Sequence, residues 1–214
     1  MLTVYTFGDS ILDCAQYNPE RVDPAGLLVA NRDDLFPEFE GCDLATRLHG
    51  EVRLERRARD GSTVDDLPAQ ARGLDIDGPA LALLTVGGND LLRGLLGDDG
   101  RGFAAFARKL TAFLDALPIR PVLLGTVYDP TFGDDRQAEG SLSVDPPLAR
   151  ANFDRMNATL AEVAPRYGVL IDIHDHFSRA GRPDWLTRVI EPSLVGASEV
   201  RRCFLRAITH GGVL

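Results

Sequence analysis

Several features that would point to particular classes of protein are scarce or missing in this sequence. The 214 residues include only three cysteines, Cys14, Cys42 and Cys203, with no CxxC pair among them. This argues against a disulfide framework or a zinc site and predicts buried or free thiols. No apolar run approaches the length that crosses a membrane. The first residues show no basic segment followed by a long apolar one, so we see no secretory signal and expect a cytoplasmic protein.

An excess of basic residues is also missing. Asp and Glu number 32 against 23 Lys and Arg, which gives a formal net charge of -9. An acidic surface repels nucleic acids and anionic membranes, so we expect neither as a partner. The hydrophobic content of 44% and charged content of 26% are ordinary for a soluble globular protein. The length suits one domain, residues 1–214, with a substantial core.

Apolar runs of strand length alternate with helical patterns along the chain. The runs cover residues 2–7, 52–54, 80–86, 121–127 and 167–173, and most of them are continuous rather than alternating. Continuous apolar strands are typical of a parallel sheet that is covered on both faces. Helical patterns cover residues 63–74, with Thr63 as a candidate cap, and residues 103–117, 147–167 and 198–208. The alternation predicts an α/β fold with helices on both faces of a parallel sheet.

Polar and glycine-rich segments follow the predicted strands, and ligands bind at that edge of an open α/β sheet. Ser10 ends the first such segment, Gly8-Asp9-Ser10, where a helix N-terminus would favour developing negative charge. Gly61 follows the second strand and would expose a backbone N–H. Asn89, in Gly87-Gly88-Asn89-Asp90, follows the third and offers the neutral amide that an oxyanion hole uses. Each segment alone could be an ordinary cap or turn, but together they predict a serine nucleophile beside an oxyanion hole.

These segments resemble the conserved blocks of the SGNH, or GDSL-type, hydrolases. Gly8-Asp9-Ser10 is similar to the first block, Gly61 to the glycine of the second, and Gly87-Gly88-Asn89-Asp90 to the third. The resemblance spans nearly the whole chain. It implies a three-layer α/β/α sandwich around a flavodoxin-like parallel sheet of strand order 2-1-3-4-5. It also implies an esterase or acylhydrolase with Ser10 as nucleophile. The oxyanion hole would consist of the N–H groups of Ser10 and Gly61 and the side chain of Asn89.

The fourth block departs from that family. The family usually carries Asp-x-x-His before a proline, whereas this chain has Arg188 and Glu191 at those positions, ahead of Pro192. Gly196 falls where the family has a glycine. A serine hydroxyl needs a base within hydrogen-bond reach. Glu191 could accept the proton, but a carboxylate is a weak base unless burial raises its pKa.

Only two of the four histidines lie at the required edge of the predicted sheet. His49 precedes the second strand and His210 follows the last helix, which places both at the opposite end. His174 and His176 follow the fifth strand, and His174 is nearer the strand end. Because triads are defined by geometry rather than by chain order, we predict that His174 or His176 activates Ser10. The acid that orients the imidazole would be Glu191, Asp172 or Asp175.

Other interpretations of these residues stay open. His174 and His176 could be structural hydrogen-bonding residues, and with no third ligand motif they predict no metal site. The chain has no phosphate loop or dinucleotide motif, so we expect no cofactor. The favoured function is a serine hydrolase that cleaves a small ester, thioester or acetylated sugar through an acyl-enzyme at Ser10. The alternatives are a catalytically impaired SGNH-like ligand-binding domain and a flavodoxin-like protein that binds phosphate in its first loop. Residues 19–39 and 129–146 are expected to shape the pocket.

Overall fold

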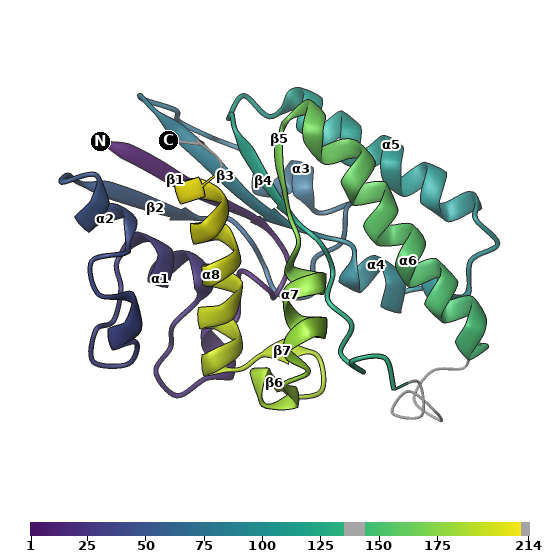
Figure 1. The fold of residues 1–214 in the computed structure, drawn as a ribbon. Helices are drawn as coiled ribbons and strands as arrows, with labels where there is room; N and C mark the ends of the chain where they lie inside the picture. Colours follow the sequence, from purple (N-terminus) through teal and green to yellow (C-terminus); the bar gives the residue numbers. More distant parts are fainter. Residues whose placement is uncertain (135–143, 211–214) are drawn as a thin grey trace.

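A five-stranded parallel sheet forms the centre of the computed structural model, which describes residues 1–134 and 144–210 (Figure 1). The strands are β1 (Leu2–Gly8), β2 (Val52–Arg56), β3 (Ala80–Thr85), β4 (Val122–Gly125) and β5 (Gly168–Ile171). Their order is β2-β1-β3-β4-β5. In the register, Thr6 of β1 lies between Arg56 of β2 and Leu83 of β3. The predicted strand order and parallel sheet are confirmed.

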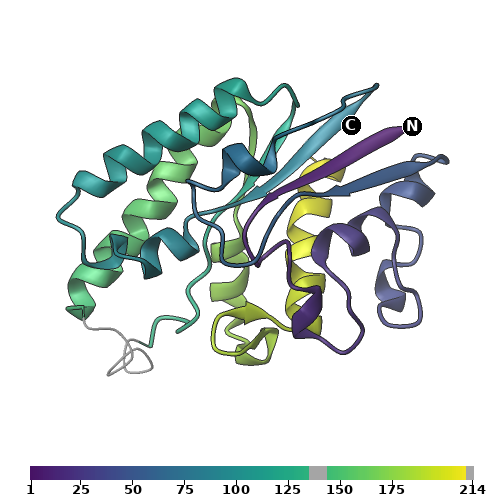
Figure 2. The same ribbon diagram turned by 180° about the vertical axis from the view of Figure 1, so that it is seen from behind.

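Helices cover both faces of this sheet, as Figure 1 shows from the front and Figure 2 from behind. One layer contains α1 (Pro24–Val29), α2 (Leu44–Arg47), α7 (Ile173–Ala180) and α8 (Leu194–His210). The other contains α3 (Leu67–Gln70), α4 (Gly88–Leu92), α5 (Arg101–Ala116) and α6 (Pro146–Val163). The predicted three-layer sandwich is therefore confirmed.

Two apolar cores lie between the sheet and its helix layers. Successive side chains of a strand point to opposite faces, so Leu83 of β3 joins the core under α1 and α8, while Leu84 joins the core under α5 and α6. Both leucines are fully buried. This two-sided burial explains why the strands read as continuous apolar runs in the sequence.

Some predicted helices have different bounds in the structure. The helix expected over residues 63–74 is reduced to α3, and Thr63 does not cap it. Instead, the N–H and hydroxyl of Thr63 both donate to the Asp66 carboxylate, at 2.8 and 3.0 Å, and close a turn ahead of the helix. Helix α3 begins only at Leu67, just before Pro68, a residue that suits the first turn of a helix. The last helix begins earlier than predicted, at Leu194.

A short antiparallel pair, β6 (Leu186–Thr187) and β7 (Glu191–Pro192), precedes α8 and was not predicted. The intervening Arg188 and Val189 have positive φ angles of 48° and 75°. This β6–β7 hairpin matters for the site because Glu191 lies on it.

Residues 19–39 and 129–146 were both expected to shape the pocket, but only residues of the second segment line the cavity beside Ser10. No residue from 19 to 39 lines the cavity beside Ser10, so that expectation is wrong; α1 packs against α8 instead. In the second segment, Asp129 organises the turn after β4 by accepting hydrogen bonds from the N–H groups of Thr131 and Gly133, both at 2.9 Å. Residues 135–143 of that segment lie outside the described residues.

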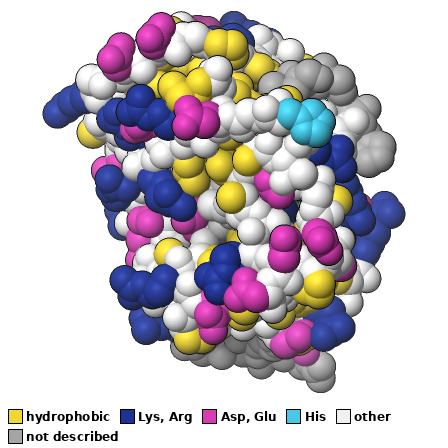
Figure 3. Space-filling model, turned by 90° about the vertical axis from the view of Figure 1, so that its left-hand side faces the viewer, with side chains coloured by type: hydrophobic (Ala, Val, Ile, Leu, Met, Phe, Trp, Pro, Cys, Tyr) yellow, Lys and Arg dark blue, Asp and Glu magenta, His cyan; other side chains and the backbone are white. Residues whose placement is uncertain are grey.

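Charged side chains of both signs are interspersed on the face shown in Figure 3, with no large area of one sign. Among the described residues, no helix combines the length and apolar character that a membrane crossing requires. The three cysteines are free, and Cys14 and Cys203 are buried.

Candidate active site

Ser10 lies directly beyond the carboxyl end of β1, where the backbone turns sharply. Gly8 has a φ of +108°, and a Cβ at this position would lie 1.6 Å from the Thr85 carbonyl oxygen. Only glycine fits such a close approach between β1 and β3. Asp9 and Ser10 both line a cavity, and they keep 2% and 9% of their surfaces exposed.

Asp9 fixes the turn that presents Ser10. Its Oδ1 accepts a hydrogen bond from the Thr85 hydroxyl at 2.8 Å and another from the Ile11 N–H at 3.2 Å. Burial raises the pKa of Asp9 to about 7, and the nearby charge of Glu191 adds to the increase. The side chain therefore holds the loop, and its charge state changes near neutral pH.

Three groups proposed for an oxyanion hole come from the loops after β1 and β2 and from the first turn of α4, which follows β3. Asn89 lines the same cavity as Ser10, and its Nδ2 donates to the Ser62 carbonyl at 3.0 Å, which uses one of its two hydrogens. The Gly61 peptide is oriented by Arg93, whose Nη2 donates to the Gly61 carbonyl at 2.8 Å. Among the described residues, neither the Ser10 N–H nor the Gly61 N–H has a hydrogen-bond acceptor.

The structure brings Glu191 to Ser10. The Ser10 hydroxyl is close enough to the Glu191 carboxylate for hydrogen bonding between them to lower the carboxylate's pKa. Burial has the larger effect and raises the pKa of Glu191 above its ordinary value. The side chain is buried, and among the described residues its Oε2 has no hydrogen-bond partner. A carboxylate in this position can accept the proton of the hydroxyl.

The backbone around Glu191 is held from several sides. Tyr128, in the segment after β4, donates its hydroxyl hydrogen to the Ile190 carbonyl and stacks on Phe177 with ring centroids 4.8 Å apart. Thr187 pairs with Glu191 across the hairpin. After it, the Ser193 N–H donates to the Trp185 carbonyl at 2.9 Å. These contacts fix the position of the carboxylate relative to the sheet.

His174 and His176 lie on α7 rather than in a loop, and their rings contact other residues. The His176 Nε2 is 2.8 Å from the Glu199 Oε2. The His174 Nδ1 is 3.4 Å from the Ser178 hydroxyl, and its ring packs on Phe153 at 5.0 Å. No hydrogen bond between described residues joins either imidazole to Ser10, and neither imidazole lines the cavity.

The remaining acidic candidates also have defined partners. The Asp172 carboxylate accepts from the Asp175 N–H at 2.9 Å and caps α7, and Asp175 pairs with Arg179 at 2.8 Å. Arg188, at the family's usual acid position, lies 5.1 Å from the centre of the Tyr17 ring, and its charge lowers the pKa of Glu191. No group of three or more potential metal ligands occurs in residues 1–134 and 144–210.

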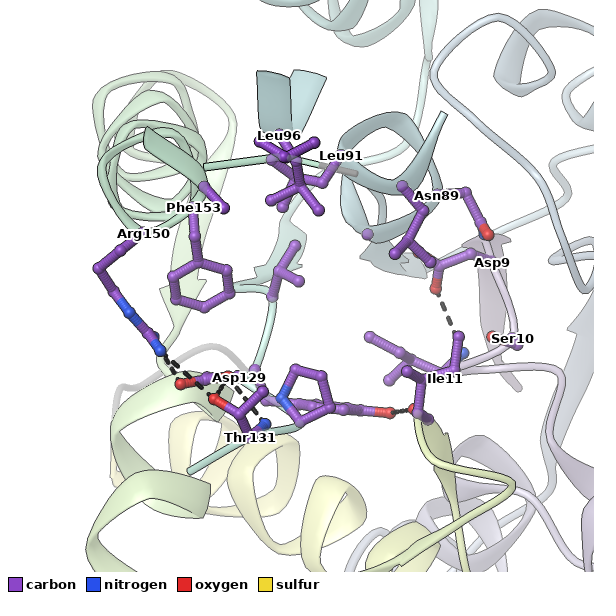
Figure 4. A pocket seen from close by; sticks show the side chains of 18 of the residues that line it. Asp9, Ser10, Ile11, Asn89, Leu91, Leu96, Asp129, Thr131, Arg150 and Phe153 are labelled. Atoms are coloured by element: carbon purple, nitrogen blue, oxygen red, sulfur yellow. Dashed lines mark hydrogen bonds and ion pairs between the residues drawn. The ribbon is translucent and has the colours of Figure 1, made fainter. Parts of the chain in front are cut away.

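A cavity of about 340 Å³ opens beside Ser10. Figure 4 shows Ser10 and Asn89 on one side of it and Arg150, Phe153 and Asp129 on the other. The sequence predicted little of this lining. Tyr128 and Asp129 could have been predicted to line the cavity, because they follow a predicted strand. The residues of α6 that line it could not, because apolar residues at helical spacing are equally typical of a helix that packs on the core.

The fold is found in solved structures of esterases. The chain is 20% identical to the acetylxylan esterase Axe2 of Geobacillus stearothermophilus, with a TM-score of 0.67 over 96% of this chain and 93% of that one. A lipase/acylhydrolase of Enterococcus faecalis is 21% identical, with a TM-score of 0.67 over 99% and 97%. A G-D-S-L family lipolytic protein of Veillonella parvula is 18% identical, with a TM-score of 0.60 over 98% and 99%. At these identities the likeness concerns the fold.

Comparison with curated proteins gives no match. The model of the GDSL-like lipase/acylhydrolase family, however, matches residues 6–196, which include the segments of Ser10, Gly61 and Asn89 and extend through Glu191. The resemblance seen in the sequence is confirmed, and the chain belongs to the GDSL-like lipase/acylhydrolase family.

Proposed function

We propose that the protein hydrolyses esters with the Ser10 hydroxyl as nucleophile and the Glu191 carboxylate as proton acceptor. The observation that carries the proposal is the approach of these two side chains at the carboxyl end of β1, beside a cavity that Asn89 also lines. Membership of the family supports ester hydrolysis as the reaction type. The roles of the individual residues are our proposal.

In the first half of the reaction, the Ser10 Oγ attacks the ester carbonyl carbon while its proton passes to Glu191. The carbonyl oxygen becomes an oxyanion, which the N–H groups of Ser10 and Gly61 and the Asn89 amide would stabilise. When the intermediate collapses, the carbon–oxygen bond to the alcohol breaks and the protonated Glu191 returns the proton to that oxygen. The alcohol leaves, and the acyl group stays on Ser10 as an ester.

In the second half, a water molecule takes the place of the alcohol. It passes a proton to Glu191 and attacks the acyl-enzyme carbonyl, and the same donors stabilise the oxyanion. Collapse releases the carboxylic acid, and the proton on Glu191 returns to the Ser10 oxygen. The net reaction consumes one ester and one water and yields one acid and one alcohol.

Burial makes Glu191 a better base than an exposed glutamate. Because burial raises its pKa, the carboxylate binds a proton more strongly. Only the deprotonated form can accept the Ser10 proton, so we expect the rate to increase with pH through the raised pKa of Glu191. The assignment of the base to His174 or His176 stays a prediction; their contacts with Ser178 and Glu199 favour Glu191 instead.

One observation favours a second function, a ligand-binding domain with little catalysis. The partner of Ser10 is a carboxylate, which is a weaker base than imidazole near neutral pH. In the structural neighbour Axe2, a variant with a histidine replaced by alanine is described as a catalytic mutant. A chain of this family that lacks a histidine beside its serine could keep the pocket and bind a ligand without turnover.

The test compares turnover of p-nitrophenyl butyrate by the wild type and by Ser10→Ala, Glu191→Gln, His174→Ala and His176→Ala. We expect Ser10→Ala to lose at least a thousandfold in kcat and Glu191→Gln on the order of a hundredfold or more. Glu51→Gln, an exposed change of the same kind, serves as the control and keeps full activity. Thermal unfolding of each variant checks that the fold is intact.

Each other outcome has a defined meaning. Full activity in Glu191→Gln with loss of activity in a folded His174→Ala or His176→Ala variant moves the base to that imidazole. No turnover by the wild type between pH 5 and pH 9, on this and other esters, points to the binding domain.

A further inference from the structure

We propose that the cavity beside Ser10 holds the acyl group of the substrate, and that this group is an aliphatic chain of medium length rather than an acetyl group. The inference rests on the proposed function and adds the class of substrate. It follows from the lining of the cavity, its size, its position relative to Ser10 and Glu191, and the polar pair at its far side.

The lining next to Ser10 is mainly apolar. It is built by residues of α4, α6 and the loops between the strands and helices, including Leu91, Leu92, Leu96, Val127, Ala149 and Phe153. Leu92, which leaves 46% of its surface exposed, is part of this lining. Such a wall attracts aliphatic or aromatic groups and offers few hydrogen bonds to a sugar.

The cavity is too large for an acetyl group. An apolar cavity of about 150 Å³ is enough for benzene, and this one measures about 340 Å³. A single methyl group would leave most of it filled with water in contact with leucine, valine and phenylalanine side chains. A chain of about four to eight carbons would replace that water, and each buried methylene adds to the affinity.

The position of the cavity favours the acyl group over the alcohol. The leaving oxygen must take its proton from Glu191, so the alcohol has to lie on the Glu191 side of Ser10. Glu191 does not line the cavity, whereas Ser10 and Asn89 do. With the oxyanion directed at Asn89 and the alcohol at Glu191, the remaining substituent of the carbonyl carbon points into the cavity.

The ion pair between Arg150 and Asp129 limits the length of the acyl chain. Across the cavity from Ser10, the Arg150 Nη1 lies 2.5 Å from the Asp129 Oδ2, and Thr131 is bonded to the same carboxylate (Figure 4). Methylene groups that reach this pair gain no apolar contact and would displace water from charged groups. We therefore expect activity to rise with chain length and then to fall once the chain reaches Arg150.

The first experiment measures kcat/KM for p-nitrophenyl esters from acetate to dodecanoate, so that only the acyl group changes. The hexanoate should exceed the acetate at least tenfold, with an increase of about threefold per methylene until the optimum. Ala149→Trp fills the cavity and should reduce the hexanoate-to-acetate ratio at least tenfold; Ala149→Leu is the milder version in case the larger side chain impairs folding. Ala151→Trp, on the same helix but exposed and outside the cavity, should leave the ratio unchanged.

A binding measurement separates this inference from the proposed chemistry. In Ser10→Ala, calorimetric titration should show hexanamide binding at least tenfold more tightly than acetamide, and Ala149→Trp should abolish the difference. This result would support the pocket even if the wild type had no turnover. The inference is overturned if acetate is the best substrate and hexanamide binds no more tightly than acetamide, or if Ala149→Trp and Ala151→Trp have the same effect.

Discussion

Asp9 is the most deeply buried carboxyl group beside Ser10, with 2% of its surface exposed, and its titration is coupled to folding. In the folded protein its pKa is raised to about 7, whereas the ordinary value is 3.8. The folded state therefore holds a proton on Asp9 over a pH range in which the unfolded chain has lost it. By linkage, the stability that this proton contributes is complete below about pH 4 and is lost as the pH rises towards 7.

Asp9→Asn removes this titration while an amide oxygen still accepts from Thr85 and Ile11. Between pH 4 and pH 8 the wild type loses the stability that the Asp9 proton contributes, whereas the variant does not. We therefore expect the difference in free energy of unfolding, variant minus wild type, to increase over this range by an amount on the order of 2 to 4 kcal/mol. Urea unfolding at several pH values measures the difference. A difference that stays constant over this range would mean that Asp9 is ionised throughout.

Single residues also show how far the sequence determines the site. Ser10, Gly61 and Asn89 could be placed at one edge of the sheet because each lies in the segment after a strand, and parallel strands end at the same edge. The choice between Glu191, His174 and His176 could not be made this way, because all of them lie at the same edge. The direction of each side chain depends on the β6–β7 hairpin and on α7, and neither was visible in the pattern of apolar residues.

At the scale of elements, the β6–β7 hairpin is the part of the fold that positions Glu191. It is only four paired residues long, so its geometry depends on packing against the start of α8. Gly196, in the first turn of α8, lies close to the backbone just before the hairpin: a Cβ there would lie 1.9 Å from the Trp185 carbonyl oxygen. The N–H of Gly196 also donates to the Ser193 hydroxyl at 3.2 Å.

Gly196→Ala should push the hairpin away from α8 and displace Glu191. We expect a loss of about 1 to 3 kcal/mol in stability and a fall in kcat that is larger than the fall in binding of hexanamide. Thermal unfolding and ester turnover measure the two effects. Gly50→Ala is the matched control, because its Cβ would lie 3.6 Å from the nearest atom, an ordinary contact. Equal activity in both variants would show that the hairpin does not position the catalytic carboxylate.

For the molecule as a whole, the architecture of the fold could be predicted from the sequence, whereas the cavity could not. Continuous apolar runs such as residues 80–86 predict strands covered on both faces, and their alternation with helical patterns leaves few topologies. The cavity instead combines residues as distant in the chain as Ile11, Leu91, Phe153 and Ile190. Packing in three dimensions decides whether an apolar side chain lines the cavity or fills the core. The sequence does not distinguish the two, because the spacing of apolar residues is the same in both cases.

The roles of Ser10 and Glu191 are tested by the mass of the intact protein after incubation with a fluorophosphonate, which reacts with activated serine hydroxyls. We expect one covalent adduct on the wild type, located at Ser10 by peptide mapping, and none on Ser10→Ala. The adduct should form at least tenfold more slowly on Glu191→Gln but at the wild-type rate on Glu51→Gln. A wild-type protein that stays unlabelled, or a Glu191→Gln variant labelled as fast as the wild type, would contradict the assignment of Ser10 and Glu191 as nucleophile and base.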